Sequence, residues 1–285
     1  DYFQPKRYWT KLEAFMDPIG NKTVEELAST AKPRRYEQGR VMGGGSSVNG
    51  QVAIRGLPAD YDEWASLGAE GWSFNDVLPY FRRLERDMDF DGPFHGKDGP
   101  IAIRRTFPKD WGGLSLAFRD AVVARGIPYV DDCHAYFKDS CFPFTKNNVY
   151  MRRVSAAVGY LDDATRLRKN LHILAESVVE GLVFEGKRAV GVKLRRGGET
   201  QTIKGREIIV STGAIHSPAL LMRAGIGPAD HLRERGIALL ADRPGVGSNL
   251  QDHPLVGFGL HIKPAARLSP TLKNNFMLHM RWSSK

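Results

Sequence analysis

The stretch GRVMGGGSSVNG, residues 39–50, contains the residue types in this sequence that most directly suggest chemistry. Consecutive glycines leave backbone N–H groups unshielded by Cβ atoms, and a left-handed or nest conformation there forms a concavity for phosphate oxygens. The serines add hydroxyl groups, whereas Arg40 either adds positive charge or is an ordinary surface residue. The stretch therefore predicts a backbone that approaches an anionic ligand closely.

A second candidate is REIIVSTGAIHSPALLMRAGIG, residues 206–227. The apolar residues 208–210 predict a short strand, which is followed by a glycine turn and a helix with Ser217 as N-cap, Pro218 at its first position and Gly225 as its stop. A strand, a tight turn and a capped helix make half of a nucleotide-binding βαβ unit. A purely structural turn fits the same pattern.

Other catalytic patterns are absent from the sequence. It contains no Gly-x-x-x-x-Gly-Lys-Ser/Thr, no Gly-x-Ser-x-Gly and no Gly-x-Gly-x-x-Gly, which disfavours nucleotide hydrolysis and serine-hydrolase chemistry. The eight histidines are scattered singly, so no metal site is expected. Cys133 and Cys141 could pair if their Cα atoms approached within about 7 Å, but we expect two free thiols.

The segments between the motifs predict mixed α/β organisation. In residues 58–87, Asp60 or Asp62 can begin a first helix and Ser73 caps a second. A further helix is expected within 115–127, with Gly126 ending it, and another over 155–166. Between them, residues 128–150 are expected to form a long aromatic loop, which is typical of a substrate pocket. Residues 171–204 predict a meander of three or four antiparallel strands.

Composition limits the class of protein. A chain of 285 residues with 42% hydrophobic and 26% charged residues is typical of a soluble globular protein. Its net charge of +9 favours anionic ligands, but its basic residues are interleaved with acids, so a nucleic-acid-binding module is the least favoured interpretation. No apolar run near 18 residues and no leader segment is found, and a cytoplasmic location is expected.

The residues around the glycine triplet resemble a known family. GRVMGGGSSVNGQVAIRGLPADYD, residues 39–62, is similar to the first signature of the glucose-methanol-choline (GMC) oxidoreductases, which are FAD-dependent enzymes that oxidise alcohols. GAIHSPALLMRAGIG, residues 213–227, resembles the second signature, except that Ala224 stands where the family usually has serine. GWSFNDVLPYFRRLE and PGVGSNLQDHP, residues 71–85 and 244–254, extend the resemblance over nearly all the chain from Tyr36 onward.

The resemblance implies a fold and a cofactor. The fold would be α/β, with a Rossmann-like FAD-binding domain of the GMC type and a second, substrate domain on an antiparallel sheet. Val179 would hold the adenine of FAD through its backbone. The implied contacts in the first signature are Val41, Gly43, Gly44, Gly45, Ser46, Asn49, Gly50, Gln51 and Val52.

The resemblance also implies a division into domains. Residues 36–87 and 166–260 would form two parts of the FAD-binding domain, and residues 88–165 and 261–285 two parts of the substrate domain. Residues 1–35 would form a lid or connecting segment of the FAD-binding domain.

The implied reaction is hydride transfer from the CH–OH carbon of a small alcohol to flavin N5, with reoxidation by O₂ or a quinone. The alcohol would be choline-like, a sugar or another primary alcohol, and the motifs favour the choline-dehydrogenase-like branch. Neither a metal nor a nucleic acid is expected as a partner. No catalytic residue is assigned, because the family's catalytic histidine pair would lie beyond Lys285. The family's glycine fingerprint, which binds the FAD pyrophosphate, would lie before Asp1.

The ends of the chain, DYFQPKRYW and MRWSSK, predict a central fragment of a longer protein. No catalytic role in place of the family's pair is expected for four histidines of this chain, namely His216, His253, His261 and His279. The alternative to an active oxidoreductase is a truncated, non-catalytic flavoprotein fragment.

Overall fold

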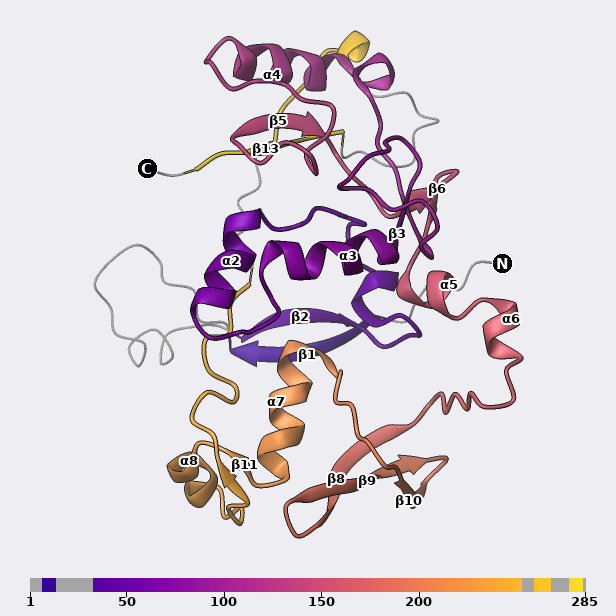
Figure 1. Ribbon diagram of the computed structural model, residues 1–285, viewed down its shortest axis with the longest axis vertical. Helices are drawn as coiled ribbons and strands as arrows, with labels where there is room; N and C mark the ends of the chain where they lie inside the picture. Colours follow the sequence, from indigo (N-terminus) through magenta and orange to yellow (C-terminus); the bar gives the residue numbers. More distant parts are fainter. Residues whose placement is uncertain (1–6, 14–32, 253–258, 268–276, 284–285) are drawn as a thin grey trace. The chain divides into compact units, whose positions relative to one another are not determined.

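The computed structural model describes residues 7–13, 33–252, 259–267 and 277–283 (Figure 1). Contacts within the chain divide it into two compact units, Asp1–Leu171 with Leu260–Lys285, and His172–Gly259. Each unit is described by itself. The assignment of segments to cofactor and substrate domains stays a prediction, and most of the expected lid over 1–35 lies outside the described residues.

The first unit begins with two paired strands that lead into the glycine-rich stretch. β1 (Arg7–Glu13) and β2 (Pro33–Gly39) are antiparallel, with Arg7 opposite Gly39. After β2 the chain turns sharply, and η1 (Gly44–Ser47) forms one 3₁₀ turn. Gly43 and Gly44 have φ angles of 87° and 52°, so the left-handed conformation predicted from the glycines is confirmed.

α2 (Pro58–Ser66) begins earlier than expected. Proline has a fixed φ and no N–H group, which suits the first position of a helix. The carboxylate of Asp60 accepts a hydrogen bond from the backbone N–H of Leu57 (2.6 Å), so it stabilises the first turn from inside the helix. The predicted start at Asp60 or Asp62 was therefore wrong.

α3 (Phe74–Leu84) has the predicted cap. The Ser73 hydroxyl accepts from the N–H of Asp76 (3.4 Å), and the Asp76 carboxylate accepts from the N–H of Ser73 (3.2 Å). This reciprocal arrangement satisfies N–H groups that the first turn leaves without partners. The rings of Tyr61 on α2 and Phe81 on α3 pack edge to face with their centres 5.6 Å apart, which helps to hold the two helices together.

Short strands build the core of the first unit. β3 (Glu85–Asp87) pairs in parallel with β4 (Ile101–Ile103), and β6 (Asn148–Val149) pairs antiparallel with β7 (Arg152–Arg153). The buried core cluster consists of Ile101, Ala102, Ile103 and Val154, with Ala53 and Val149 packed against it. Because Ala53 lies just after the glycine-rich stretch, this packing fixes one end of that stretch.

The segment 128–150 is not a single loop, as was expected. It contains β5 (Ser140–Pro143), which pairs antiparallel with β13 (Leu278–Arg281), as well as β6. α4 (Gly113–Val123) contacts β5 and ends before Gly126, as predicted (Figure 1). The remaining short elements of this part are η2 (Pro108–Asp110) and η3 (Pro264–Ala266).

The helix expected over 155–166 is two helices. α5 (Ala156–Tyr160) is capped by the hydroxyl of Ser155, and α6 (Asp163–Arg166) is capped by the carboxylate of Asp162. The prediction was wrong because the internal Asp162 is a better N-cap than a helix-interior residue.

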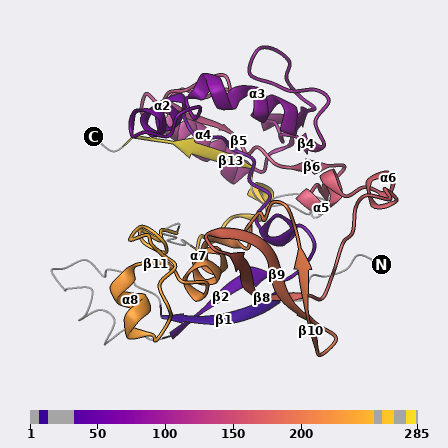
Figure 2. The same ribbon diagram turned by 60° about the horizontal axis from the view of Figure 1, so that its bottom comes forward.

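The second unit opens with the predicted meander. β8 (Val178–Glu185), β9 (Arg188–Arg196) and β10 (Glu199–Lys204) form an antiparallel sheet in the order β10-β9-β8. Three strands are therefore confirmed, and residues 171–175 form none. α7 contacts β8, and Figure 2 shows this helix beside the sheet.

α7 (Gly213–Arg223) begins at the glycine turn itself, with Thr212 as its N-cap. The predicted cap, Ser217, lies inside the helix, where its hydroxyl accepts from the N–H of Thr212 (3.0 Å). Residues 208–210 have no strand assignment, so the predicted strand was wrong. Gly225 does end the helix, with a φ of 82°.

The second unit closes with a small α/β segment. β11 (Ile226–Gly227) and β12 (Ala241–Asp242) pair in parallel, and α8 (Ala229–Glu234) connects them. In the part of the chain that the structure describes, no helix has both the length and the apolar character needed to span a bilayer.

Candidate cofactor site

The glycine triplet combines close packing on one side with open space on the other. A Cβ atom on Gly43 would lie 3.0 Å from the backbone nitrogen of Ala157 in α5, so this position has no room for a side chain. A Cβ on Gly44 or Gly45 would meet nothing within 4 Å. The loop is therefore packed tightly behind Gly43 and open over Gly44 and Gly45, as a cradle for a ligand requires.

The serine hydroxyls bond to the protein itself. Ser46 Oγ donates to the carbonyl of Gly43 and accepts from the N–H of Ala156 (3.0 Å). Ser47 Oγ donates to the carbonyl of Met42 (2.7 Å). These bonds shape the loop, and a contact between Ser46 and FAD stays a prediction.

The residues after the turn present an exposed edge. Asn49, Gly50 and Val52 are exposed. Gln51 has a φ of 64°, which is uncommon for a residue with a side chain. Its N–H donates to Asn49 Oδ1 (3.0 Å), and its side-chain Oε1 accepts from Asn148 Nδ2 (2.8 Å). Contacts from both sides hold the strained residue in place.

The structure brings most of the predicted cofactor residues together, because Val41 to Val52 form one continuous loop in the first unit, which we call the glycine-rich loop. Val179 lies on β8 in the second unit, opposite Leu194 of β9. Its place relative to the loop stays a prediction.

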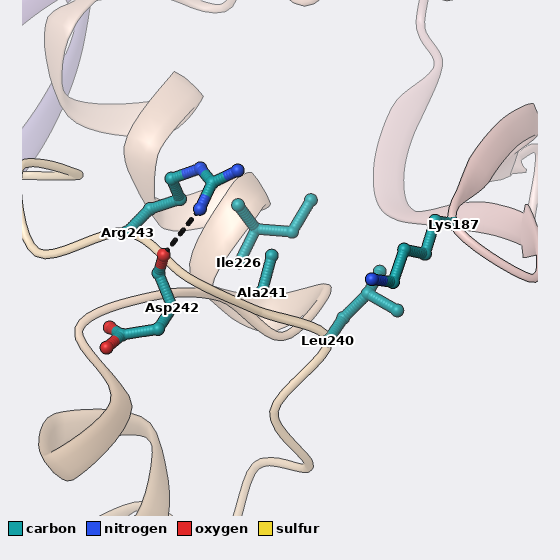
Figure 3. Close-up of a pocket in the computed structure, with 6 residues that line it drawn as sticks. All are labelled: Lys187, Ile226, Leu240, Ala241, Asp242 and Arg243. Atoms are coloured by element: carbon teal, nitrogen blue, oxygen red, sulfur yellow. Dashed lines mark hydrogen bonds between the residues drawn. The ribbon is translucent and has the colours of Figure 1, made fainter.

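A pocket of about 440 Å³ lies in the second unit (Figure 3). None of the predicted cofactor residues lines it; the lining residues are Lys187, Ile226, Leu240, Ala241, Asp242 and Arg243. The Asp242 carboxylate accepts from the N–H of Ala229 (3.1 Å), and Arg243 donates to the carbonyl of Asp242 (2.8 Å). Asp242 and Arg243 therefore help to hold the β11–β12 segment.

Sequence spacing did not reveal a buried ionic cluster in the first unit. The ionic cluster comprises Arg55, Glu85, Asp87, His95, Arg105 and Asp132. Arg105 Nη1 lies 2.8 and 2.9 Å from the two carboxylate oxygens of Asp87, and both residues are 2% exposed. His95 Nδ1 lies 2.9 Å from Asp87, and its Nε2 lies 2.8 Å from Asp132.

These contacts shift the pKa values of the ionic cluster. Burial alone would lower the pKa of His95, but its contacts with the carboxylates of Asp132, Asp87 and Glu85 raise it to about 10. Burial would raise the pKa of Asp87, but His95 and Arg105 hold it well below its usual range. His95 is therefore an imidazolium that bridges carboxylates.

His134 lies beside the ionic cluster, with its ring 6.2 Å from that of His95. Burial and the charges of Arg55 and Arg105 lower its pKa to about 3, so it is neutral. Ligating atoms of Asp87, His95 and His134 lie within 4.8 Å of one another, which is a spacing that could hold a metal ion. Arg105 and the His95 proton already compensate the Asp87 charge, so we expect no metal there, and that absence stays a prediction.

Lys146 is a buried cation close to the glycine-rich loop. Its backbone bridges to Val52 and to Arg104, and the residue is 4% exposed. Its Nζ lies 5.4 Å from the centre of the Phe144 ring. Among the described residues it forms no salt bridge, and burial lowers its pKa to about 8.

Replacing Lys146 with methionine is therefore expected to stabilise the protein by about 1–3 kcal/mol at pH 6, because burial of this side chain disfavours its charged form. The gain should shrink above pH 8, where the folded protein sheds this proton before the unfolded chain does. Urea unfolding at several pH values measures both effects. Lys138→Met, at an exposed position, is the control and should change the free energy of unfolding by less than about 0.5 kcal/mol. A destabilised Lys146→Met variant would contradict the prediction.

The expectation that His216, His253, His261 and His279 have no catalytic role stays a prediction. His279 lies on β13 against the ring of Phe144 (4.7 Å), and burial lowers its pKa. His216 lies in α7, His261 is exposed, and His253 lies outside the described residues.

Both cysteines are free, as expected, and both are buried. Burial raises the pKa of each thiol, to about 11 for Cys141.

Comparison with known proteins places these features in a family. Residues 25–255 match the family described as GMC oxidoreductase. The chain is 46% identical over 248 residues to 5-(hydroxymethyl)furfural oxidase from Methylovorus sp. (strain MP688), covering 87% of this chain and 47% of that protein. It is 43% identical over 217 residues to oxygen-dependent choline dehydrogenase from Brucella ovis, covering 76% of this chain and 39% of that protein.

Solved structures agree with this assignment. Pyridoxine 4-oxidase from Mesorbium loti aligns with a TM-score of 0.72 at 29% identity, covering 85% of this chain and 45% of that one. A fungal aryl-alcohol oxidase aligns with a TM-score of 0.71 at 26% identity, covering 87% and 43%. The chain thus spans about half the length of these proteins or less. The expected GMC-type fold and the similarity to choline dehydrogenases are confirmed, and the chain belongs to the GMC oxidoreductases.

Proposed function

We propose that the glycine-rich loop of the first unit binds FAD and that the protein oxidises the CH–OH group of a small alcohol. The observation that carries the proposal is the open space over Gly44 and Gly45, in a loop whose other side is packed against α5. Asn49, Gly50 and Val52 continue the same exposed edge. Backbone without Cβ atoms suits the pyrophosphate of a ligand. The exposed polar and apolar groups that follow suit its flat ring.

The family and its named relatives support the substrate class. These relatives are named for 5-(hydroxymethyl)furfural, choline, pyridoxine and aryl alcohols. The proposed substrate is therefore a small primary alcohol, which loses a hydroxyl proton and a hydride and becomes an aldehyde. FAD, when bound, supplies the hydride acceptor. The names of the relatives include oxidases and an oxygen-dependent dehydrogenase, which favours O₂ over a quinone as the final acceptor.

Titration of the purified chain with FAD tests the cofactor, with quenching of flavin fluorescence as the readout. Saturable binding supports the proposal, and no binding contradicts it for this chain. Anaerobic addition of choline, 5-(hydroxymethyl)furfural, pyridoxine or benzyl alcohol then tests the reaction through loss of the visible flavin absorption. FAD binding without bleaching by any alcohol would favour a non-catalytic flavoprotein fragment.

Replacing Gly45 with valine is expected to weaken FAD binding by at least about tenfold, because the new side chain would fill the open space over the loop. The free energy of unfolding should change by less than about 0.5 kcal/mol, because a Cβ atom at this position would meet no protein atom within 4 Å. Ala59→Val adds bulk at an exposed position of α2 and serves as the control. Unchanged FAD affinity in Gly45→Val would show that the loop is not the cofactor cradle.

A further inference from the structure

Arg153 connects the end of β7 to the glycine-rich loop. Its Nη1 donates to the carbonyl of Ser46 (3.1 Å) and to Asn49 Oδ1 (2.8 Å), and its Nη2 donates to the carbonyl of Asn49 (2.7 Å). One guanidinium thus binds three acceptors within four residues of the loop. Hydrogen bonds from a charged donor are stronger than those between neutral groups.

The loop needs such a partner. η1 is a single turn of 3₁₀ helix, and a turn of this length gains too little from its own hydrogen bonds to be stable alone. The glycines before it lose more backbone freedom on folding than other residues do. Carbonyl groups at the end of a helix also carry partial negative charge, which a cation there stabilises.

The backbone that carries Arg153 is itself well fixed. The next residue, Val154, belongs to the buried core, and its N–H and carbonyl both bond to Asn147 (2.9 and 2.8 Å). A second tether runs beside the guanidinium, from the N–H of Ala156 to Ser46 Oγ (3.0 Å). The loop is therefore held against a rigid support.

We propose that Arg153 is a positioning residue for FAD: it holds Ser46 and Asn49 from behind, so that the exposed edge formed by Gly45, Asn49 and Gly50 is already in its binding conformation before the cofactor arrives. The proposal rests on the proposed function of the loop. Preorganisation raises affinity because the entropy of ordering the loop is lost on folding and not on binding.

Three variants of the whole chain test the role of Arg153. Arg153→Met removes all three hydrogen bonds, Arg153→Lys keeps the charge but loses the planar fork, and Arg86→Met changes an exposed arginine on β3 of the same unit as a control. Two quantities are measured: the dissociation constant for FAD, and the rate of amide hydrogen exchange in residues 43–52 without FAD.

We expect Arg153→Met to weaken FAD binding by at least about tenfold and to speed exchange across residues 46–50, with Arg153→Lys between it and wild type. Arg86→Met should match wild type in both measurements. If Arg153→Met does not fold, Arg153→Lys carries the same expectation with a smaller effect.

Wild-type exchange rates and FAD affinity in Arg153→Met would overturn the proposal. The exchange measurement also separates this proposal from the function of the loop, because it needs no cofactor. If wild type binds no FAD, the cofactor assignment fails, whereas faster exchange in Arg153→Met would still show that Arg153 orders the loop. If wild type binds FAD and the variant binds it equally well, only the role of Arg153 fails.

Discussion

Replacing Arg105 with methionine is expected to lower the free energy of unfolding by about 3–5 kcal/mol. The substitution leaves the carboxylate of Asp87 buried without the guanidinium that binds both of its oxygens. It also removes the guanidinium from the face of the Phe90 ring, 4.7 Å away. Urea unfolding followed by circular dichroism measures the loss.

The exposed neighbour Arg104 provides the matched control, and Arg104→Met should change stability by less than about 0.5 kcal/mol. Combining Arg105→Met with Asp87→Asn should recover part of the loss, because the second change removes the unpaired charge. Equal effects of Arg104→Met and Arg105→Met would show that the Arg105–Asp87 pair contributes no more than a surface charge.

The contribution of His95 to the free energy of unfolding is expected to fall as pH rises from about 6.5 to 10. Its pKa is about 10 in the folded protein and about 6.5 when unfolded, so folding favours the protonated form. The stabilisation is fully present below pH 6.5 and is lost as pH rises through the folded pKa. Because His95 is 3% exposed and contacts two carboxylates, the loss should be roughly 3–5 kcal/mol.

Free energies of unfolding at pH 6, 8 and 10 test this expectation. His95→Gln should be less stable than wild type at pH 6 and should show a much smaller fall towards pH 10. His172→Gln, at an exposed position, should keep the wild-type slope. A wild-type slope in His95→Gln would assign the pH dependence to other groups.

Elements with local signals were predicted well from the sequence. The cap on α3 depends on Ser73 and Asp76, three residues apart, and the meander from β8 to β10 depends on alternating residues joined by short turns. The sharp turn at Gly43 and Gly44 likewise follows from the glycines themselves. In each case the residues that determine the structure are close together in the chain.

Elements that depend on distant partners were missed. Residues 208–210 resemble a strand, but no strand pairs with them among the described residues, and Ile209 is 82% exposed. The expected cap at Ser217 failed because Ser-Pro also fits inside α7, one turn after the true start. A local pattern cannot tell these alternatives apart.

The same limit applies to the candidate site. The family resemblance identified the glycine-rich loop, but not the residue that supports it from more than 100 positions away, Arg153. The ionic cluster joins Asp87, His95 and Asp132, whose spacing in sequence follows no motif. The long-range pairs form only when the first unit folds, so their partners could not be read from the sequence.

The pairing of β5 with β13 has a consequence for synthesis on the ribosome. Ser140–Pro143 must wait for Leu278–Arg281, and at about 5–20 residues per second the delay between the two strands is roughly 7–30 s. During that time β5 presents an unpaired edge to other nascent chains. The interval before the polypeptide reaches Leu278 is therefore the period in which a chaperone that shields this edge would most improve the yield of folded protein.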